Sequence, residues 1–298
     1  MTRVARPRPA RNVAEPAAAR AAVSDTALLA AAGRAAESRR PDPLVTDPLA
    51  ESFLDAVAPP VLDPSRKAMG ERVARLLGDM FILRTRYFDD ELTRFTASGG
   101  RQCVLLGAGL DTRAYRLRLP STTTVYELDL PPTLEFKDSV LLGRSERPVC
   151  RRIPVRADLA TDWTTPLIRA GFDPRARTAW LAEGLLLYLT ARQGDRLLAT
   201  LTAHSAPHSM VLVEHVNRAA QTAAAGRAVA EWVAALGEPW RSELDDPARW
   251  LARFGWTGRV HDIRELALTH RRPVPPFAGT ESGDDRRVWC VSATPRNP

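Results

Sequence analysis

Residues 102–130 read QCVLLGAGLDTRAYRLRLPSTTTVYELDL, and this stretch decides the fold. The apolar run 103–106 breaks at Gly107 and Gly109, with one alanine between them, and a helical segment and a second apolar run, 125–130, follow. This order of strand, glycine turn, helix and strand is typical of the opening unit of a nucleotide-binding sheet. The glycines allow a sharp turn and a close approach of the backbone to a ligand.

The acids of this stretch indicate which ligand to expect. Asp129 lies 20 residues after Gly109, a spacing at which a carboxylate accepts both hydroxyls of an adenosine ribose, and Glu127 is the second candidate. A dinucleotide site has a third glycine where this chain has Thr112, and a carboxylate at Asp111 would repel a phosphate. The pattern therefore favours a ligand with a cationic centre and no phosphate, such as S-adenosyl-L-methionine.

Composition limits the other possibilities. The 298 residues are 45% hydrophobic, which predicts one large domain or one domain with a cap. No run of about 20 apolar residues is present, so no membrane span is expected, and no apolar segment typical of a secretory signal follows the N-terminus. Cys103, Cys150 and Cys290 are widely spaced, which fits a reducing cytoplasm, and no Cys/His cluster has metal-ligand spacing.

The net charge of +7 raises the question of nucleic-acid binding. Lysine occurs only at Lys67 and Lys137, and the arginines are spread along the chain without interleaved aromatic residues. A nucleic-acid surface is therefore not expected.

Three segments are predicted: a disordered tail at 1–22, a helical cap at 23–98 and a ligand-binding domain at 99–298. In the cap we expect helices at 26–38 (capped by Ser24 or Asp25), 49–57 and 65–96. In the domain we expect strands at 102–106, 124–130, 153–157, 178–183, 210–216, 256–260 and 288–294, with helices that include 134–142, 163–170, 191–205, 217–236 and 246–254. This is the order of a Rossmann-like class I methyltransferase fold, an α/β fold with a seven-stranded, mostly parallel sheet whose antiparallel last strand lies beside the fifth.

Ligands of such sheets bind at the carboxyl ends of the strands. Strands two to five end in acids, at Asp129, Asp158, Glu183 and Glu214. We expect Asp158 to accept from the adenine amine, Leu159 to contact the ring, and Glu183 to lie near the ammonium or sulfonium group.

The amino-acid carboxylate of the ligand needs a cation, for which Arg84 and Arg86 are candidates. A neutral hydroxyl acceptor would need a general base, for which His215 is a candidate beside its structural interpretation.

Several motifs occur together in order. They are SDTALLAAAGRAAESRRPDPLVTDPLAE (24–51), RTRYFDDEL (84–92), LLGAGLDTRAYRL (105–117), VYELDLP (125–131), ADL (157–159) and LAEGLLLYL (181–189). Over about 24–295 the chain resembles the leucine carboxyl methyltransferase-like family, in particular its actinobacterial S-adenosyl-L-methionine-dependent branch. The resemblance implies a Rossmann-like methyltransferase with an N-terminal helical cap, and cofactor binding at Asp129, Asp158 and Leu159. It also carries over Gly107, Glu183 and an arginine of the RTR segment.

Family members that methylate a phosphatase C-terminus have an early lysine and an arginine after the DL pair, whereas this chain has no lysine before Lys67 and has Ala160. Tyr188 matches their substrate-facing tyrosine, and a core position fits it equally. We expect O-methylation of a carboxyl or hydroxyl group on a small metabolite or peptide, while the acceptor and the oligomeric state stay open. The alternatives are a nicotinamide-dependent oxidoreductase and a non-catalytic binding protein on the same fold.

Overall fold

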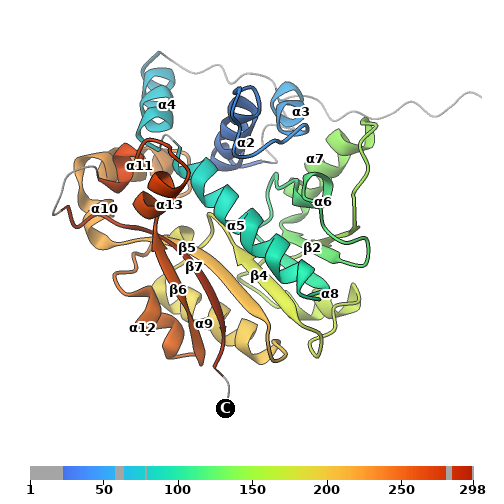
Figure 1. Cartoon of the computed structure of the whole chain (residues 1–298). Helices are drawn as coiled ribbons and strands as arrows, with labels where there is room; N and C mark the ends of the chain where they lie inside the picture. The colour runs from blue at the N-terminus through green and yellow to red at the C-terminus, as the bar shows by residue number, and fades with distance from the viewer. Residues whose placement is uncertain (1–22, 58–63, 78, 280–283, 297–298) are drawn as a thin grey trace, which may run out of the picture.

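The computed structural model describes residues 23–57, 64–77, 79–279 and 284–296 (Figure 1). The predicted tail at 1–22 lies outside these residues. The described chain forms one seven-stranded sheet with the strand order β3-β2-β1-β4-β5-β7-β6. The strands are β1 (Gln102–Leu106), β2 (Thr124–Asp129), β3 (Arg151–Arg156), β4 (Thr178–Ala182), β5 (Met210–Val216), β6 (Trp256–Asp262) and β7 (Val288–Pro295).

The strand directions confirm the predicted fold. β1 to β5 pair in parallel, whereas β7 runs antiparallel between β5 and β6. β1 and β4 are buried along their whole length, which explains why they read as continuous apolar runs in the sequence. In register, Leu106 at the end of β1 pairs with Leu128 of β2, so the glycine turn lies beside Asp129.

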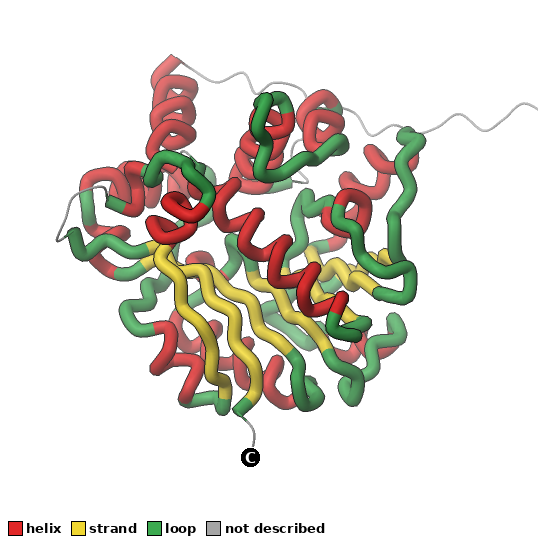
Figure 2. The backbone as a smooth tube through the Cα atoms, viewed as in Figure 1, coloured by secondary structure: helices red, strands yellow, loops and turns green. Residues whose placement is uncertain are grey.

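Helices cover both faces of the sheet and its carboxyl edge (Figures 1 and 2). The N-terminal helices are α2 (Asp25–Ser38), α3 (Ala50–Asp55), α4 (Pro64–Leu77) and α5 (Met80–Ala97). Those that follow are α6 (Arg113–Arg116), α7 (Pro131–Leu142), α8 (Thr164–Arg169), α9 (Ala191–Ala203), α10 (Arg218–Thr222), α11 (Ala224–Ala235), α12 (Pro247–Ala252) and α13 (Ile263–Thr269), with short 3₁₀ turns η1 (Leu186–Tyr188) and η2 (Pro276–Ala278).

Ser24, one of the two predicted caps, begins α2, because its Oγ accepts a hydrogen bond from the Ala27 N–H at 3.0 Å. α5 lies across one face of the sheet in Figures 1 and 2, and its buried Leu83, Phe88 and Leu92 belong to the largest core cluster. Of the helices in the described ranges, none combines the length and the apolar character needed to cross a bilayer.

Two predicted helices were too long. The segment 65–96 is divided into α4 and α5, and the sequence between them, Gly78-Asp79, disfavours an unbroken helix because glycine has a low helix propensity. The segment 217–236 is divided at Ala223, whose backbone is extended (φ −63°, ψ 159°). The helical segment expected after the glycine turn is a single turn, α6.

Candidate active site

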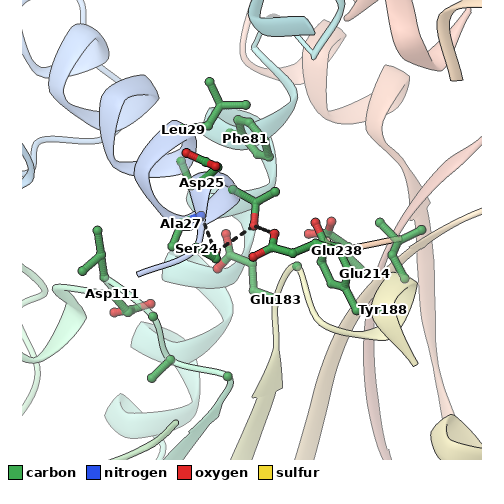
Figure 3. A pocket seen from close by; sticks show the side chains of 18 of the residues that line it. Ser24, Asp25, Ala27, Leu29, Phe81, Asp111, Glu183, Tyr188, Glu214 and Glu238 are labelled. Carbon is green, nitrogen blue, oxygen red and sulfur yellow. Dashed lines mark hydrogen bonds between the residues drawn. The ribbon is translucent and has the colours of Figure 1, made fainter. Parts of the chain in front are cut away.

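The carboxyl ends of the parallel strands open into a cavity of about 800 Å³. Its floor consists of the glycine turn after β1 and the ends of β2, β4 and β5, and α2, α5, α11 and the loop after α11 contribute much of the walls. Figure 3 shows Leu29 of α2 and Phe81 of α5 across from Glu183 and Glu214. α2 lies on the glycine turn, since the guanidinium of Arg34 donates to the Leu110 carbonyl at 2.7 Å. The N-terminal helices therefore close the open edge of the sheet over this cavity.

The glycine turn and Asp129 meet as the spacing predicts. Gly107 and Gly109 have φ values of +63° and +45°, a region that residues with a Cβ adopt rarely. The Gly109 N–H donates to Asp129 Oδ2 at 2.6 Å, and the Leu130 N–H donates to Oδ1 at 2.7 Å. All four residues line the cavity. Burial raises the pKa of Asp129 despite these two hydrogen bonds.

Arg84 lies between two acids at the ends of neighbouring strands. Its Nε is 3.1 Å from Glu183 Oε1 after β4, and its Nη1 is 2.5 Å from Glu214 Oε1 in β5. The side chains of Arg84 and Glu214 are 9% and 1% exposed, so this is a buried ion pair. Thr85 Oγ1 also donates to Glu183 at 3.0 Å. Arg84 therefore lines the cavity as predicted, but its charge is already balanced by protein carboxylates.

Arg113, which the sequence analysis did not single out, extends this charge network. It pairs with Asp89 at 2.6 Å, with Glu183 at 2.7 Å and with Asp111. Burial alone would raise the pKa of Asp111, but the positive charges of Arg113, Lys137 and Arg116 outweigh it and lower the value to about 2. Asp111 is thus ionised and paired, so its expected repulsion of a phosphate is weaker than the sequence suggests.

Three other candidates lie outside the cavity lining. Arg86 pairs with Asp90 at 2.9 Å on the half-exposed side of α5, so of the two arginines only Arg84 lines the cavity. Asp158 is exposed and accepts from the Ala160 N–H at 2.8 Å, and Leu159 packs beside the core cluster behind the sheet. Both follow Ala157, whose N–H donates to the Asp129 carbonyl at 3.0 Å, so they border the Asp129 edge without lining the cavity.

Glu127, the second ribose candidate, is buried away from the cavity. Its carboxylate pairs with Lys137 and with Arg152, each at 2.8 Å, and it is fully enclosed. Side chains alternate along a strand, so the two-residue spacing puts Glu127 and Asp129 on one face, but only Asp129 reaches the edge. Asp129 is therefore the acid that remains available to a ligand.

His215 does not face the cavity, which corrects its assignment as a candidate base. It follows Glu214 in β5, so the alternation of side chains turns it toward the opposite face. There it lines a separate cavity of about 160 Å³ with Ser242. The Val216 N–H donates to Nδ1 at 2.9 Å, so the proton is on Nε2, which donates to Ser242 Oγ at 3.1 Å. Burial lowers the pKa of His215 to about 4.

This burial predicts a pH dependence of stability. The pKa of His215 is about 4 in the folded state and about 6.5 in the unfolded state, so the unfolded state binds more protons between these values. The contribution is complete above pH 6.5 and is lost as the pH falls toward 4. We expect the free energy of unfolding to be lower at pH 5 than at pH 7 by about 2 kcal/mol through this group. Urea unfolding of His215→Gln should remove that part of the difference, and an unchanged difference would contradict it.

Tyr188 does line the cavity, in the 3₁₀ turn after β4. Burial raises the pKa of its hydroxyl, and the nearby polar groups of Thr26 and Trp240 act against that rise. Thr26 also donates to Glu238 Oε2 at 2.9 Å, which joins the start of α2 to the loop after α11 (Figure 3). Its place on the cavity is compatible with the predicted substrate-facing position of Tyr188, and the role of Tyr188 stays a prediction.

The helical walls of the cavity are largely apolar, and the sequence analysis did not assign them to the site. They include Leu29 of α2, Phe81 of α5 and Trp232 of α11, together with Trp240. Apolar residues at helical spacing can either pack in the core or line a cavity, and the sequence does not distinguish the two. Only the tertiary structure shows that these residues line the cavity. Among the described residues, no group of three or more His, Cys, Asp or Glu side chains could hold a metal ion.

Known proteins are similar to this chain over most of its length. The sequence profile of the leucine carboxyl methyltransferase family matches residues 27–202. A protein of Parafrankia sp. strain EAN1pec, provisionally named an S-adenosyl-L-methionine-dependent methyltransferase, is 40% identical over 266 residues, covering 87% of this chain and 86% of the relative. A protein of Streptomyces coelicolor with the same provisional name is 41% identical over 273 residues, covering 89% and 94%.

Solved structures share the fold. A crystal structure from Thermobifida fusca, provisionally described as a methyltransferase, superposes with a TM-score of 0.61 over 93% of this chain and 96% of that chain, at 16% identity. A DUF574 family protein of Streptomyces avermitilis superposes with a TM-score of 0.58 over 79% and 92%, also at 16% identity. At this identity the likeness extends to the fold alone.

Proposed function

The chain belongs to the leucine carboxyl methyltransferase family and is an S-adenosyl-L-methionine-dependent methyltransferase, and from this premise we propose that it methylates an oxygen atom. The acceptor is a carboxyl or hydroxyl group of a small metabolite or peptide. We assign cofactor binding to the glycine turn and Asp129. Glu183 and Arg84 shape the floor of the same cavity, and Asp158 and Leu159 border its edge.

The observation that carries the cofactor assignment is the hydrogen-bonding state of Asp129. Each of its carboxylate oxygens accepts one backbone N–H, from Gly109 and from Leu130. A carboxylate has about four acceptor sites, and Asp129 also has a side-chain hydrogen bond with Thr133. One site therefore stays open for a ribose hydroxyl, and the second hydroxyl would replace Thr133. The glycine turn that holds Asp129 also leaves the backbone open to close approach. These groups suit an adenosine ribose.

The charges around the cavity favour a cationic ligand over a phosphate. Its described lining contains six carboxylates and four guanidinium groups. Each of these arginines is already paired with an acid: Arg34 with Asp47, Arg84 with Glu183 and Glu214, Arg113 with three acids, and Arg116 with Asp89. A sulfonium therefore suits this surplus of negative charge, whereas a pyrophosphate would find no uncommitted cation among the described lining residues.

The protein promotes methyl transfer by positioning the cofactor and the acceptor and by excluding water from the cavity. When bound, S-adenosyl-L-methionine supplies an electrophilic methyl group on a positively charged sulfur. The carboxylates of the described lining outnumber its guanidinium groups, which favours a negative potential, and the helical walls of α2, α5 and α11 shield the cavity from bulk water. An ionised acceptor oxygen needs no base, whereas a hydroxyl group must lose its proton as it takes the methyl group. Tyr188 is a candidate to orient the acceptor, because it lines the same space.

Calorimetric titration of the purified protein tests this function. S-adenosyl-L-methionine and S-adenosylhomocysteine should bind with micromolar dissociation constants, and NAD should not bind in the same range. Binding of NAD without binding of either adenosyl ligand would replace the proposal with a nicotinamide-dependent oxidoreductase. No binding of any of the three would leave a non-catalytic protein on this fold.

A further inference from the structure

The lining of the cavity includes a part that the cofactor assignment does not use. Single-ligand pockets in proteins have volumes of about 300–1,000 Å³, and at about 800 Å³ this cavity lies in the upper part of that range. Its two kinds of lining differ sharply. The strand ends contribute the glycine turn and the paired charges, whereas the helices and the loop after α11 contribute apolar and aromatic side chains: Leu29, Leu77, Met80, Phe81, Val229, Trp232, Val233, Leu236 and Trp240. We call this second part the aromatic wall.

The aromatic wall suits an apolar molecule that contains rings. Trp240 is held by the buried Phe277, at a centroid distance of 5.8 Å and an interplanar angle of 81°. The guanidinium of Arg84 lies over the ring of Phe81, 4.6 Å from its centre, and fixes the ring. Phe81 also lines the cavity, so a ligand can contact it. Aromatic side chains fixed in this way contribute large contact area and favour stacked or edge-on rings.

A carboxylate acceptor is poorly matched to this cavity. It needs a cation, and all four arginines in the described lining are committed to protein acids. The lining carboxylates exceed the arginines, so an anionic group would enter against a negative potential and lose its water without gaining a partner. This disfavours the carboxyl group among the two oxygen acceptors of the proposed function.

Glu238 is the polar group of the lining that can bind a hydroxyl group of the methyl acceptor. It lines the cavity beside the aromatic wall and is half-buried. One of its oxygens accepts from Thr26 Oγ1 at 2.9 Å, and among the described residues it forms no ion pair. A carboxylate held by a neutral donor keeps both its charge and free acceptor sites. It can therefore receive the O–H of a ligand, and such charge-assisted hydrogen bonds are about twice as strong as neutral ones.

We propose that the methyl acceptor is an uncharged, apolar, ring-bearing molecule that presents a hydroxyl group, and that Glu238 accepts the hydrogen bond of this hydroxyl. When the hydroxyl oxygen takes the methyl group, the sulfur–methyl bond breaks, the hydroxyl proton passes to the Glu238 carboxylate, and the neutral thioether remains as the second product. The inference rests on the proposed function, because it names the acceptor of that same reaction. It decides between the two oxygen acceptors by the charges on the cavity lining. It also makes Glu238 a residue that determines specificity through binding, separate from the floor that holds the cofactor.

Binding of three matched probes to the complex with S-adenosylhomocysteine tests this proposal. The probes are 4-phenylphenol, biphenyl-4-carboxylate and 4-(aminomethyl)biphenyl, which share one ring system and are neutral, anionic and cationic at pH 7. Calorimetry or ligand-observed NMR should give an affinity for the phenol at least about tenfold higher than for the carboxylate. The amine carries a charge opposite to that of Glu238, so it is the control for charge attraction alone. Failure of S-adenosylhomocysteine itself to bind would instead refute the cofactor assignment.

A variant isolates the part played by Glu238. Glu238→Gln keeps the size and removes the charge, so the phenol should lose about tenfold in affinity while the carboxylate gains. Glu231→Gln, an exposed position on α11 that does not line the cavity, is the matched control and should leave all three affinities unchanged. Equal or tighter binding of the carboxylate in the native protein would overturn the proposal. So would an unaltered preference in Glu238→Gln, or no binding of any probe to the cofactor complex.

Discussion

Arg84→Met is expected to lower the free energy of unfolding by about 3–5 kcal/mol. The side chain is 9% exposed and lies between Glu183 and Glu214, whose side chains are 14% and 1% exposed. Glu183 would keep Arg113 as a partner, but Glu214 would be left as a buried carboxylate without a counter-charge. Burial already raises the pKa of Glu214, and the charge of Arg84 acts against that rise, so loss of Arg84 would raise the pKa further. Urea unfolding followed by circular dichroism measures the effect.

Two further variants separate charge from packing. Arg84→Met combined with Glu214→Gln removes the orphaned charge, so part of the lost stability should return. Arg86→Met changes an arginine two positions away that is 39% exposed and pairs with Asp90 one helical turn on, and it should cost less than about 1 kcal/mol. Equal losses for the Arg84 and Arg86 variants, or a double variant no more stable than Arg84→Met, would contradict the buried ion pair.

Asp129→Ala is expected to raise the dissociation constant of S-adenosylhomocysteine about 100-fold, because it removes charge-assisted hydrogen bonds to the ribose worth about 1.5–3 kcal/mol. It also removes the acceptor of the Gly109 N–H, so the glycine turn loses one of its supports. Calorimetric titration measures the change, and an unfolding curve for the apo variant shows how much of it comes from the fold.

Asp55→Asn is the matched control for this prediction. Asp55 is exposed at the end of α3 and does not line the cavity, so the dissociation constant should stay within about twofold of the native value. Asp129→Asn keeps one acceptor oxygen and should lie between the native protein and the alanine variant. Native-like affinity in Asp129→Ala would remove Asp129 from the cofactor site.

The fold could be predicted because its signals are local. The apolar run 103–106, the two glycines and the acid at 129 fix a strand, a turn and a second strand without knowledge of the remaining chain. The parallel strands β1 and β4 are buried along their whole length and therefore read as short, largely apolar runs. Helix ends are harder to predict, because apolar periodicity continues across them. It does not show that α4 ends at Leu77 and α5 begins at Met80, or that the backbone is extended at Ala223.

The site could be predicted only in part, because side-chain partners lie far apart in the sequence. Arg113 and Asp89 are separated by 24 positions and Arg84 and Glu214 by 130, so no local pattern shows that these charges pair. Glu214 and His215 are neighbours at the end of β5, and side chains alternate along a strand, so only one of them can face the cavity. The structure gives that place to Glu214. Trp232 and Trp240 resemble core residues in the sequence. The place of Trp232 on the cavity follows from the packing of α11 beside α4, and Trp240, in the loop after α11, packs on Phe277.

The central claim is that the adenosyl ligand lies on the glycine turn with its ribose on Asp129. A crystal structure of the complex with S-adenosylhomocysteine tests this most directly. We predict both ribose hydroxyls within about 3.2 Å of the Asp129 carboxylate, with the backbone of Gly107 and Gly109 against the ligand. Density for the ligand at another place, such as the small cavity beside His215, or a ribose turned away from Asp129, would contradict it.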